Sequence, residues 1–530
     1  MENTRKYPVG IQTFSEIIGD RYVYVDKTDL VWQLAHYAKY IFLSRPRRFG
    51  KSLLSSTLNS YFSGERELFE GLKIMNLEQE WAQYPVIHLD LSTAKGCRSV
   101  SALEDRLKFI IRNYRNRYSV SNELTPGSQL ASIIERANIE AQRQVVVIID
   151  EYDAPLLDVL HQDESLAEFR AVMQEFYQVL KPAEPQIKFC FITGITKFSQ
   201  LSIFSTINNL TNVTMDVRFG NICGITEQEL VTTLKEDIGL LAESYEMTWD
   251  EMHQKLKQKY DGYRFTEVPI EIYNPFSLIK AFQQGKVGNF WFESGTPTFL
   301  IRQMKHFGTD IMSLDSMEVS ADAFDKPTEA MEDALPLLYQ SGYLTIKDYD
   351  RETEAYTLGI PNGEVRIGYT QGLLPAYIGL RSSDVQMGFA MKFWRALKKG
   401  DIDQAMRDMQ AYLAGIPYVE GFKEKLKDVA NKEGFYEYTM YLIFSMLNVY
   451  ARTQVKCAGG RVDMVVWMSD AIYVFELKVN DTAENALKQI DDKSYAIPYT
   501  TDGRRVVKVG VSMNADTRMV ENWRISVYPK

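Results

Sequence analysis

Residues 40–54 read YIFLSRPRRFGKSLL, an apolar run followed by a basic loop and then by Gly50, Lys51 and Ser52 at the start of a helical pattern. A loop of this kind between a strand and a helix N-terminus presents backbone N–H groups to phosphate, while the lysine and the hydroxyl supply a cation and a Mg²⁺ ligand. The segment therefore predicts a P-loop. Its first half departs from the motif, because Arg45 stands at the position of the first glycine.

Two later apolar runs end in polar residues that suit the same chemistry. The run QVVVIIDEYDAPL at 144–156 places Asp150 and Glu151 directly after a buried strand. In ATPases of the ASCE type, such an Asp holds Mg²⁺ through water and the Glu orients or deprotonates the attacking water. The run KFCFITGITKF at 188–198 carries Thr193 near its end, where a sensor of the γ-phosphate would lie.

We therefore expect ATP and Mg²⁺ to bind where the loop meets these strand ends. Ser52 and Asp150 are the expected Mg²⁺ ligands, and Glu151 is the expected catalytic residue. A chance Gly-Lys-Ser tripeptide and a solvated acidic pair are the alternatives, but they do not explain why both occur together. The expected nucleotide contacts are Arg47, Arg48, Phe49, Gly50, Lys51, Ser52, Asp150 and Thr193. The two arginines would clamp phosphate or, alternatively, form a surface for a protein partner.

The first 220 residues alternate short apolar runs with helical segments, which predicts an α/β domain with a largely parallel sheet. The predicted strands are nearly continuous apolar runs, as expected for strands covered on both faces. They are Tyr40–Leu43, Val86–Leu89, Val145–Ile149 and Lys188–Ile192, separated by helices such as Leu53–Phe62 and Ser101–Tyr118.

Beyond Gly224 the sequence becomes helix-rich and acidic, with a helix start at Thr226 and aromatic turns. A short helix at Ala334–Tyr339 precedes two strands for which we expect a turn at Asn362-Gly363, a pattern similar to a winged helix. The expected domains are a P-loop domain (1–222), a helical lid (223–310), a winged-helix-like region (311–370), a helical linker (371–430) and a C-terminal α/β domain (431–530).

Several of these segments together resemble the bacterial AAA-ATPase-like family, whose members commonly carry a C-terminal PD-(D/E)XK nuclease-like domain. The segments are SRPRRFGKSLL, FSEIIGDRYVYVDKT at 14–28, IIDEYDAPL, FITGITKFSQLSIFSTINNL at 191–210 and FWFESGTPTFLI at 290–301. The resemblance covers nearly the whole chain, and the family also commonly lacks the first P-loop glycine. It implies an ASCE/AAA-like P-loop domain that binds ATP through Lys51 and Ser52, with Asp26, Lys27 and Thr28 close to the nucleotide.

The C-terminal domain carries the residue pattern of such a nuclease. PD-(D/E)XK enzymes bind Mg²⁺ between an Asp on one strand and an acidic residue on the next, with a Lys two positions later. In GGRVDMVVWMSDAIYVFELKVN, Asp463 precedes Glu476 by 13 residues, which suits two antiparallel strands. Glu476 and Lys478 share one face of their strand, because residues i and i+2 point the same way. These three residues are the expected catalytic set of a restriction-endonuclease-like fold, with Asp463 and Glu476 as metal ligands.

Other residues near this motif have weaker assignments. Glu437 is a candidate further metal ligand or a solvated helix residue. Gln489 and Tyr495 fall on the expected following helix, but their spacing of six differs from the QxxxY element of related nucleases. The cations that could contact phosphate are Arg461, Lys488, Lys493, Arg504, Arg505 and Lys508.

Composition limits the remaining possibilities. The 530 residues include 60 basic and 70 acidic ones, for a net charge of −10, so the whole chain is not a simple nucleic-acid binder. The two ends differ from the average, since residues 1–120 hold 18 basic against 13 acidic residues and residues 431–530 hold 13 against 12. Four scattered cysteines, no signal peptide and no membrane span predict a reduced, cytoplasmic protein.

These observations favour a cytoplasmic ATPase that controls a Mg²⁺-dependent DNA nuclease. The alternative is a nucleotide switch without catalysis, whose nuclease-like domain serves as a docking module. A third possibility is an interaction protein that has lost both activities, against which the retained Asp150, Glu151, Asp463, Glu476 and Lys478 argue. The expected partners are ATP, DNA at the C-terminal domain, and a protein partner or a second copy of the chain, without a membrane.

Overall fold

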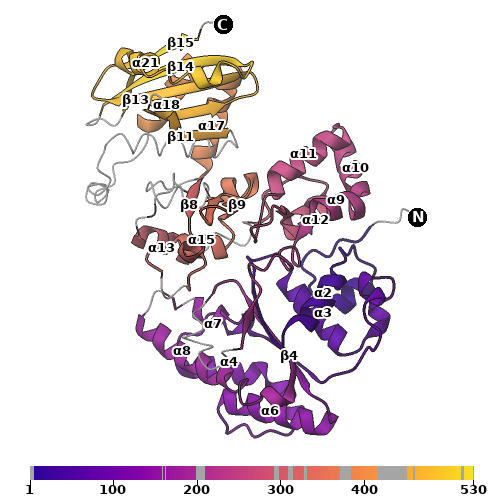
Figure 1. The fold of residues 1–530 in the computed structure, drawn as a ribbon. Helices are drawn as coiled ribbons and strands as arrows, with labels where there is room; N and C mark the ends of the chain where they lie inside the picture. Colours follow the sequence, from indigo (N-terminus) through magenta and orange to yellow (C-terminus); the bar gives the residue numbers. More distant parts are fainter. Residues whose placement is uncertain are drawn as a thin grey trace. The chain divides into compact units, whose positions relative to one another are not determined.

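The computed structural model divides the chain into two compact units, residues 1–309 with 313–364 and residues 310–312 with 365–530. Figure 1 shows the helices and strands of both units, coloured along the sequence. The structure describes residues 5–157, 159–160, 163–197, 209–291, 298–307, 309, 314, 316–327, 331–369, 383–414, 450–457, 460–514 and 519–528. Glu437 lies outside the described residues, and so do residues 292–297 of the aromatic segment at 290–301.

A five-stranded parallel sheet forms the centre of the N-terminal unit, in the order β2-β3-β4-β1-β5. Its strands are β1 (Tyr40–Ser44), β2 (Val86–Asp90), β3 (Val145–Asp150), β4 (Ile187–Gly194) and β5 (Thr211–Asn212). The first four confirm the predicted strands. The segments β1 and β3 are buried along their whole length, as expected for strands covered on both faces. The strand β4 lies between β1 and β3, and all three run parallel. The polar residues at their carboxyl ends therefore lie at one edge of the sheet.

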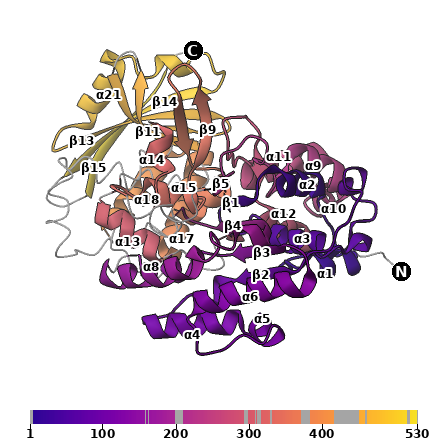
Figure 2. The same ribbon diagram turned by 60° about the horizontal axis from the view of Figure 1, so that its bottom comes forward.

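Helices cover both faces of this sheet (Figure 2). The helices α4 (Val100–Ile110), α6 (Pro126–Ala141) and α8 (Asp163–Gln178) share a core with one face, which includes Phe42, Val147 and Cys190. The helix α3 (Lys51–Phe62) covers the other face, where Phe62 stacks on Phe189 with ring centres 5.0 Å apart. The remaining helices of this part are α1 (Phe14–Gly19), α2 (Thr28–Tyr37), α5 (Arg112–Arg117) and α7 (Ala154–Leu157).

A helical layer follows, as the sequence predicts. Its first helix begins at Thr226, whose hydroxyl accepts the Glu229 N–H while the Glu229 carboxylate accepts the Thr226 N–H, forming a capping box. The elements are α9 (Glu227–Thr233), α10 (Lys235–Ser244), α11 (Trp249–Tyr260), α12 (Pro275–Gln284) and α13 (Thr298–Phe307), with the short pair β6 (Ile225–Thr226) and β7 (Ile272–Tyr273). Its designation as a lid stays a prediction.

The region expected to be a winged helix contains a three-stranded antiparallel sheet in the order β8-β10-β9. Its elements are β8 (Met317–Val319), α14 (Ala321–Phe324), α15 (Leu335–Gln340), β9 (Thr345–Asp350) and β10 (Ala355–Gly359). The expected turn at Asn362-Gly363 is wrong, because the hairpin turns at residues 351–354 and Gly363 begins a helical segment. Asn362 instead donates to the Asp261 carbonyl at 2.9 Å, so its side chain joins this region to the preceding helical layer.

The C-terminal unit contains a five-stranded sheet in the order β11-β12-β13-β14-β15. Its strands are β11 (Tyr450–Cys457), β12 (Gly460–Trp467), β13 (Ala471–Val479), β14 (Arg505–Asn514) and β15 (Met519–Val527). The pair β12-β13 is antiparallel, as the spacing of Asp463 and Glu476 predicts. The pair β13-β14 is parallel, and α21 (Ala483–Asp492) connects its strands.

Helices pack on both faces of this sheet as well. The helices α17 (Ser383–Lys398) and α18 (Ile402–Ala414) share a core with Tyr473, Phe475 and Leu477. Although they lie in the expected linker, their packing makes them part of this unit. The helix α21 covers the other face, where Ile490 packs with Ile472 and Val474. Within the described residues, no helix has both the length and the apolarity needed to cross a bilayer.

Candidate functional site

The P-loop segment lies between β1 and α3 and presents its lysine at the carboxyl edge of the sheet. Gly50 precedes α3 in the left-handed conformation, with φ of 93°, which glycine adopts without strain. Lys51 is buried, and its ammonium donates to the carbonyls of Arg45 at 3.1 Å and Pro46 at 3.3 Å. The predicted strand, loop and helix are therefore present even though the first glycine is missing.

A cavity of about 550 Å³ opens beside this loop. Residues 47–54 of the loop and α3 line one part of it, together with Glu151 and Lys27. The other walls are mainly apolar and include residues 8–12, residues 222–225, and Pro275, Phe276 and Ile279. A volume of this size, with charged groups at one end and an apolar wall at the other, suits a nucleotide.

The acidic pair after β3 lies at the same edge. Asp150 is buried, and this burial raises its pKa to about 6 against the opposing effects of the Ser52 hydroxyl and the Lys51 ammonium. Glu151 lines the cavity and has a φ of 53°, a conformation that is costly for a residue other than glycine. Its N–H donates to Asp150 Oδ1 at 3.0 Å. The fold thus brings together Lys51, Ser52, Asp150 and Glu151, although nearly 100 residues separate the two pairs.

Thr193 reaches the expected edge, but its hydroxyl is engaged within the sheet. It is fully buried and donates to the Leu43 carbonyl at 2.7 Å, which joins β4 to β1. Sequence reasoning missed its neighbour Asp153, whose buried carboxylate accepts the Thr196 N–H at 2.7 Å and the Thr196 hydroxyl at 2.6 Å. Asp153 therefore fixes the loop after β4; its position three residues beyond Asp150 was the available signal.

The three residues before Gly50, which are Arg47, Arg48 and Phe49, make different contacts. Arg47 lines the cavity. Arg48 also borders it, but its guanidinium donates to the Phe290 carbonyl at 2.7 Å and lies 3.9 Å from the ring centre of Phe276. The Phe49 side chain is buried edge-on against the rings at 263 and 265, so a nucleotide would meet mainly its backbone.

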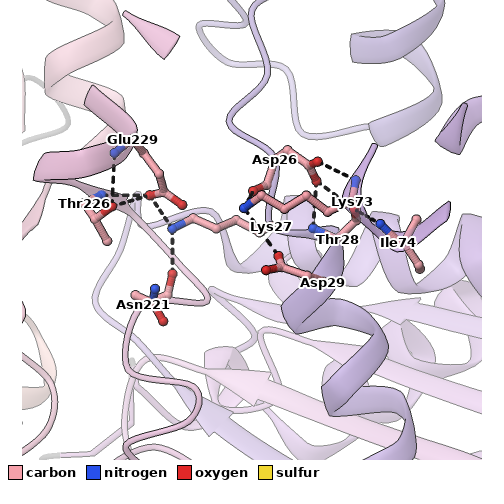
Figure 3. A network of polar contacts seen from close by, with 9 residues as sticks. All are labelled: Asp26, Lys27, Thr28, Asp29, Lys73, Ile74, Asn221, Thr226 and Glu229. Atoms are coloured by element: carbon pink, nitrogen blue, oxygen red, sulfur yellow. Dashed lines mark hydrogen bonds and ion pairs between the residues drawn. The ribbon is translucent and has the colours of Figure 1, made fainter. Parts of the chain in front are cut away.

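Of Asp26, Lys27 and Thr28, which the resemblance places near the nucleotide, Lys27 lines the cavity. Figure 3 shows the polar contacts of these three residues. The buried Lys27 ammonium donates to the Asn221 carbonyl at 2.7 Å and to Glu229 Oε2 at 2.6 Å, and burial lowers the pKa of Lys27 against the opposing effect of Glu229. Asp26 instead accepts the N–H groups of Thr28 at 2.9 Å and Lys73 at 2.7 Å. Lys27 thus joins the cavity to α9, while Asp26 supports the local fold.

The C-terminal unit brings together the predicted nuclease residues at β12 and β13. The backbone pairing of these strands begins at Met464 and Phe475, and beyond it Asp463 Oδ2 accepts the Leu477 N–H at 2.7 Å. Glu476 is 1% exposed. The Lys478 ammonium lies 3.3 Å from Glu476 Oε1. The strand alternation therefore places the carboxylate and the lysine on one face, as predicted.

The environment of Glu476 suits a bound cation. Burial and the neighbouring Asp463 raise the pKa of Glu476 to about 8, against the opposing charge of Lys478. Gln489 of α21 donates to Oε1, whereas Oε2 is buried without a hydrogen-bond partner. An orphaned carboxylate oxygen beside a second carboxylate is a hard-ligand set that fits Mg²⁺. Among the described residues, no group of three or more His, Cys, Asp or Glu side chains forms a metal site.

The structure places some of the other predicted residues around this site differently from the sequence-based expectation. Gln489 lies on α21 as expected, but Tyr495 does not, because the helix ends at Asp492 and the Tyr495 ring packs in the core beside Val462. Three of the six cations proposed to contact phosphate are paired with acids: Lys488 with Asp492, Arg504 with Asp502, and Lys508 with Asp491. The other three, Arg461, Lys493 and Arg505, have exposed side chains.

Known protein families match the chain in both of these regions. Residues 8–204 match the family described as "Predicted AAA-ATPase", and residues 431–523 match the PD-(D/E)XK nuclease superfamily. The chain is also 31% identical over 529 residues to the "Uncharacterized protein in vnfD 5'region" of Azotobacter chroococcum mcd 1, a match that covers 97% of this chain and 98% of the relative. The P-loop residues and the paired carboxylates lie within the two matched segments. The chain therefore belongs to the family of predicted AAA-ATPases that carry a C-terminal domain of the PD-(D/E)XK nuclease superfamily.

Proposed function

We propose that the N-terminal unit binds and hydrolyses ATP with Mg²⁺, and that this reaction controls a metal-dependent DNA nuclease in the C-terminal unit. The observation that carries the proposal is the meeting of Lys51, Ser52 and Glu151 at one cavity with Asp150 beside them. This set combines a phosphate-binding cation, oxygen ligands for Mg²⁺ and a carboxylate that can act on water.

Each residue of the nucleotide site has a role that follows from its position. The backbone N–H groups at the start of α3 and the Lys51 ammonium bind the phosphate chain. Ser52 and Asp150 supply oxygen ligands, and Mg²⁺ would neutralise charge on the phosphates. Glu151 reaches the cavity from the end of β3 and orients the attacking water or accepts its proton. Arg47 remains available to contact phosphate at the mouth of the loop.

The C-terminal unit has a matching division of roles. Asp463 and Glu476 would hold the metal, which would activate water and stabilise the developing charge on the phosphate. Gln489 donates to one oxygen of Glu476 and leaves the other without a hydrogen bond, so that this oxygen could hold the metal. Lys478 lies beside Glu476 and can hold the nucleophilic water or stabilise the charge of the phosphodiester.

Two pairs of variants test this proposal in the full-length protein. Lys51→Ala should abolish ATP binding, whereas Glu151→Gln should keep binding and lower turnover by at least a hundredfold. Lys478→Ala should abolish Mg²⁺-dependent cleavage of DNA, whereas Lys392→Ala, which changes an exposed lysine on α17, should not. Cleavage that persists unchanged in Glu476→Ala would contradict the nuclease assignment.

A second candidate function is a nucleotide switch without catalysis, whose C-terminal unit is a docking module. Two observations favour it: the Thr193 hydroxyl is bonded to Leu43, and three basic side chains of the nuclease-like unit are paired with acids. Under this alternative, calorimetry would detect ATP binding without phosphate release, and neither single-stranded nor double-stranded DNA would be cleaved with Mg²⁺ or Mn²⁺.

A further inference from the structure

Arg45, the residue that replaces the first glycine of the P-loop, is buried behind the loop rather than directed into the cavity. It is 1% exposed. One guanidinium nitrogen donates to the carbonyls of Ser44 at 2.9 Å and Thr214 at 2.8 Å, and another donates to the Phe219 carbonyl at 2.9 Å. The guanidinium carbon lies 4.5 Å from the ring centre of Phe265. The side chain therefore ties β1 to the segment that leads into the cavity wall at 222–225.

The backbone of Arg45 makes contacts of a different kind. Its N–H donates to the Gly194 carbonyl at 3.2 Å, which attaches the start of the loop to the end of β4. Its carbonyl accepts the Lys51 ammonium at 3.1 Å. One residue thus sets the position of the phosphate-binding lysine relative to the neighbouring strand and to the cavity wall, and a glycine could supply only the backbone part of these contacts.

The charge of Arg45 adds to this arrangement. In the described part of the chain, the guanidinium of Arg45 forms no ion pair with an Asp or Glu side chain, and its hydrogen bonds go to backbone carbonyls. An arginine remains protonated inside proteins, so a positive charge is fixed beneath the loop close to Lys51. Such a charge favours an anion in the adjoining cavity.

We propose that Arg45 is a positioning residue of the nucleotide site, which holds the P-loop lysine and the 214–225 segment in the arrangement that binds the phosphate chain. This inference rests on the proposed ATP binding. It predicts that Arg45→Gly, which restores the glycine of the common motif, weakens nucleotide binding instead of strengthening it.

The test measures the dissociation constant of Mg²⁺-ATP and the melting temperature of full-length variants. Arg45→Gly and Arg45→Met should raise the dissociation constant at least tenfold, and Arg45→Lys, which keeps the charge but loses the planar fork, should lie between them and the wild type. The matched control is Arg264→Met, because Arg264 is also buried and also donates to backbone carbonyls, those of Thr266 and Glu267. This control should lower the melting temperature and leave the dissociation constant unchanged.

The outcomes separate the two proposals. If the wild type does not bind ATP, the proposed function fails. If the wild type binds and Lys51→Ala does not, but folded Arg45→Met binds as tightly as the wild type, the role of Arg45 is refuted. Should Arg45→Gly and Arg45→Met lack a cooperative unfolding transition, Arg45→Lys decides the question: an unchanged dissociation constant overturns the inference, and a partial loss supports it.

Discussion

The Asp261 carboxylate in the helical layer should make the stability of the N-terminal unit depend on pH. Asp261 follows α11, is 2% exposed, and has the Lys257 ammonium 4.0 Å from Oδ2, beyond hydrogen-bonding range. Burial raises the pKa of this carboxyl group to about 7, with Glu271 acting in the same direction and Lys257 opposing it. Its backbone carbonyl accepts a hydrogen bond from Asn362, so an isosteric Asp261→Asn substitution leaves that contact in place.

The magnitude follows from linkage. Folding raises the pKa above the ordinary value of about 3.9, so the ionised carboxylate opposes folding. This penalty is absent below about pH 4, grows between pH 4 and 7, and is constant above about pH 7. It amounts to about 1.5 kcal/mol at pH 5 and about 4 kcal/mol at pH 8. Asp261→Asn should therefore stabilise the protein at pH 8 by about 2.5 kcal/mol more than it does at pH 5.

Urea titrations at the two pH values, followed by hydrogen exchange and mass spectrometry of the peptide that covers α11, measure this difference for the helical layer. Glu243→Gln is the matched control, because Glu243 is an exposed acid of α10, and it should change stability by less than about 0.5 kcal/mol at either pH. If Asp261→Asn gives the same change at pH 5 and pH 8, the carboxylate does not titrate in this window and the reasoning is refuted.

Three further predictions concern the two sites. Lys27→Met and Glu229→Gln should each destabilise the N-terminal unit by about 3 kcal/mol, because each leaves the other charge of a largely buried ion pair without its counter-charge; urea unfolding of the double variant should show less than the sum. Gly510→Ala should lower the melting temperature and DNA cleavage together, since a Cβ there would lie 2.4 Å from the Ala483 carbonyl oxygen and displace α21. Because metal binding requires ionised Glu476, whose pKa is raised to about 8, Mn²⁺ affinity measured by calorimetry should rise about tenfold per pH unit up to about pH 8 and then level off, and Glu476→Gln should remove this slope.

The parts of the fold that the sequence predicts correctly are those with a local signal. Apolar runs predict β1 to β4 almost residue by residue, and the signal is clearest for β1 and β3, which are buried along their whole length and therefore consist almost entirely of apolar residues. The Thr226 capping box is equally local. The prediction of a turn at Asn362-Gly363 is wrong because an Asn-Gly pair also suits other loops, and here Asn362 donates to the Asp261 carbonyl while Gly363 begins a helical segment.

In the candidate sites, too, the sequence predicts some features and misses others. Motif spacing predicts which residues approach one another, and Lys51 with Asp150 and Asp463 with Glu476 do so. Spacing does not predict which side chains are already engaged by distant parts of the chain. The Gln489 contact with Glu476 depends on how closely α21 approaches β14, which the absence of a side chain at Gly510 permits.

The arginines of the P-loop show why this distinction matters for function. In sequence, Arg47 and Arg48 are equivalent candidates for phosphate contact, and Arg45 stands at the position of the first glycine. In the structure, the guanidinium of Arg45 is bonded to carbonyls behind the loop, and that of Arg48 donates to Phe290 and lies over the Phe276 ring. A group that already satisfies backbone carbonyls must break those bonds to reach a ligand, at about 1 kcal/mol or more for each. Arg47, which lines the cavity, is therefore the arginine whose replacement should alter ATP hydrolysis directly, while the other two should act through the shape of the site.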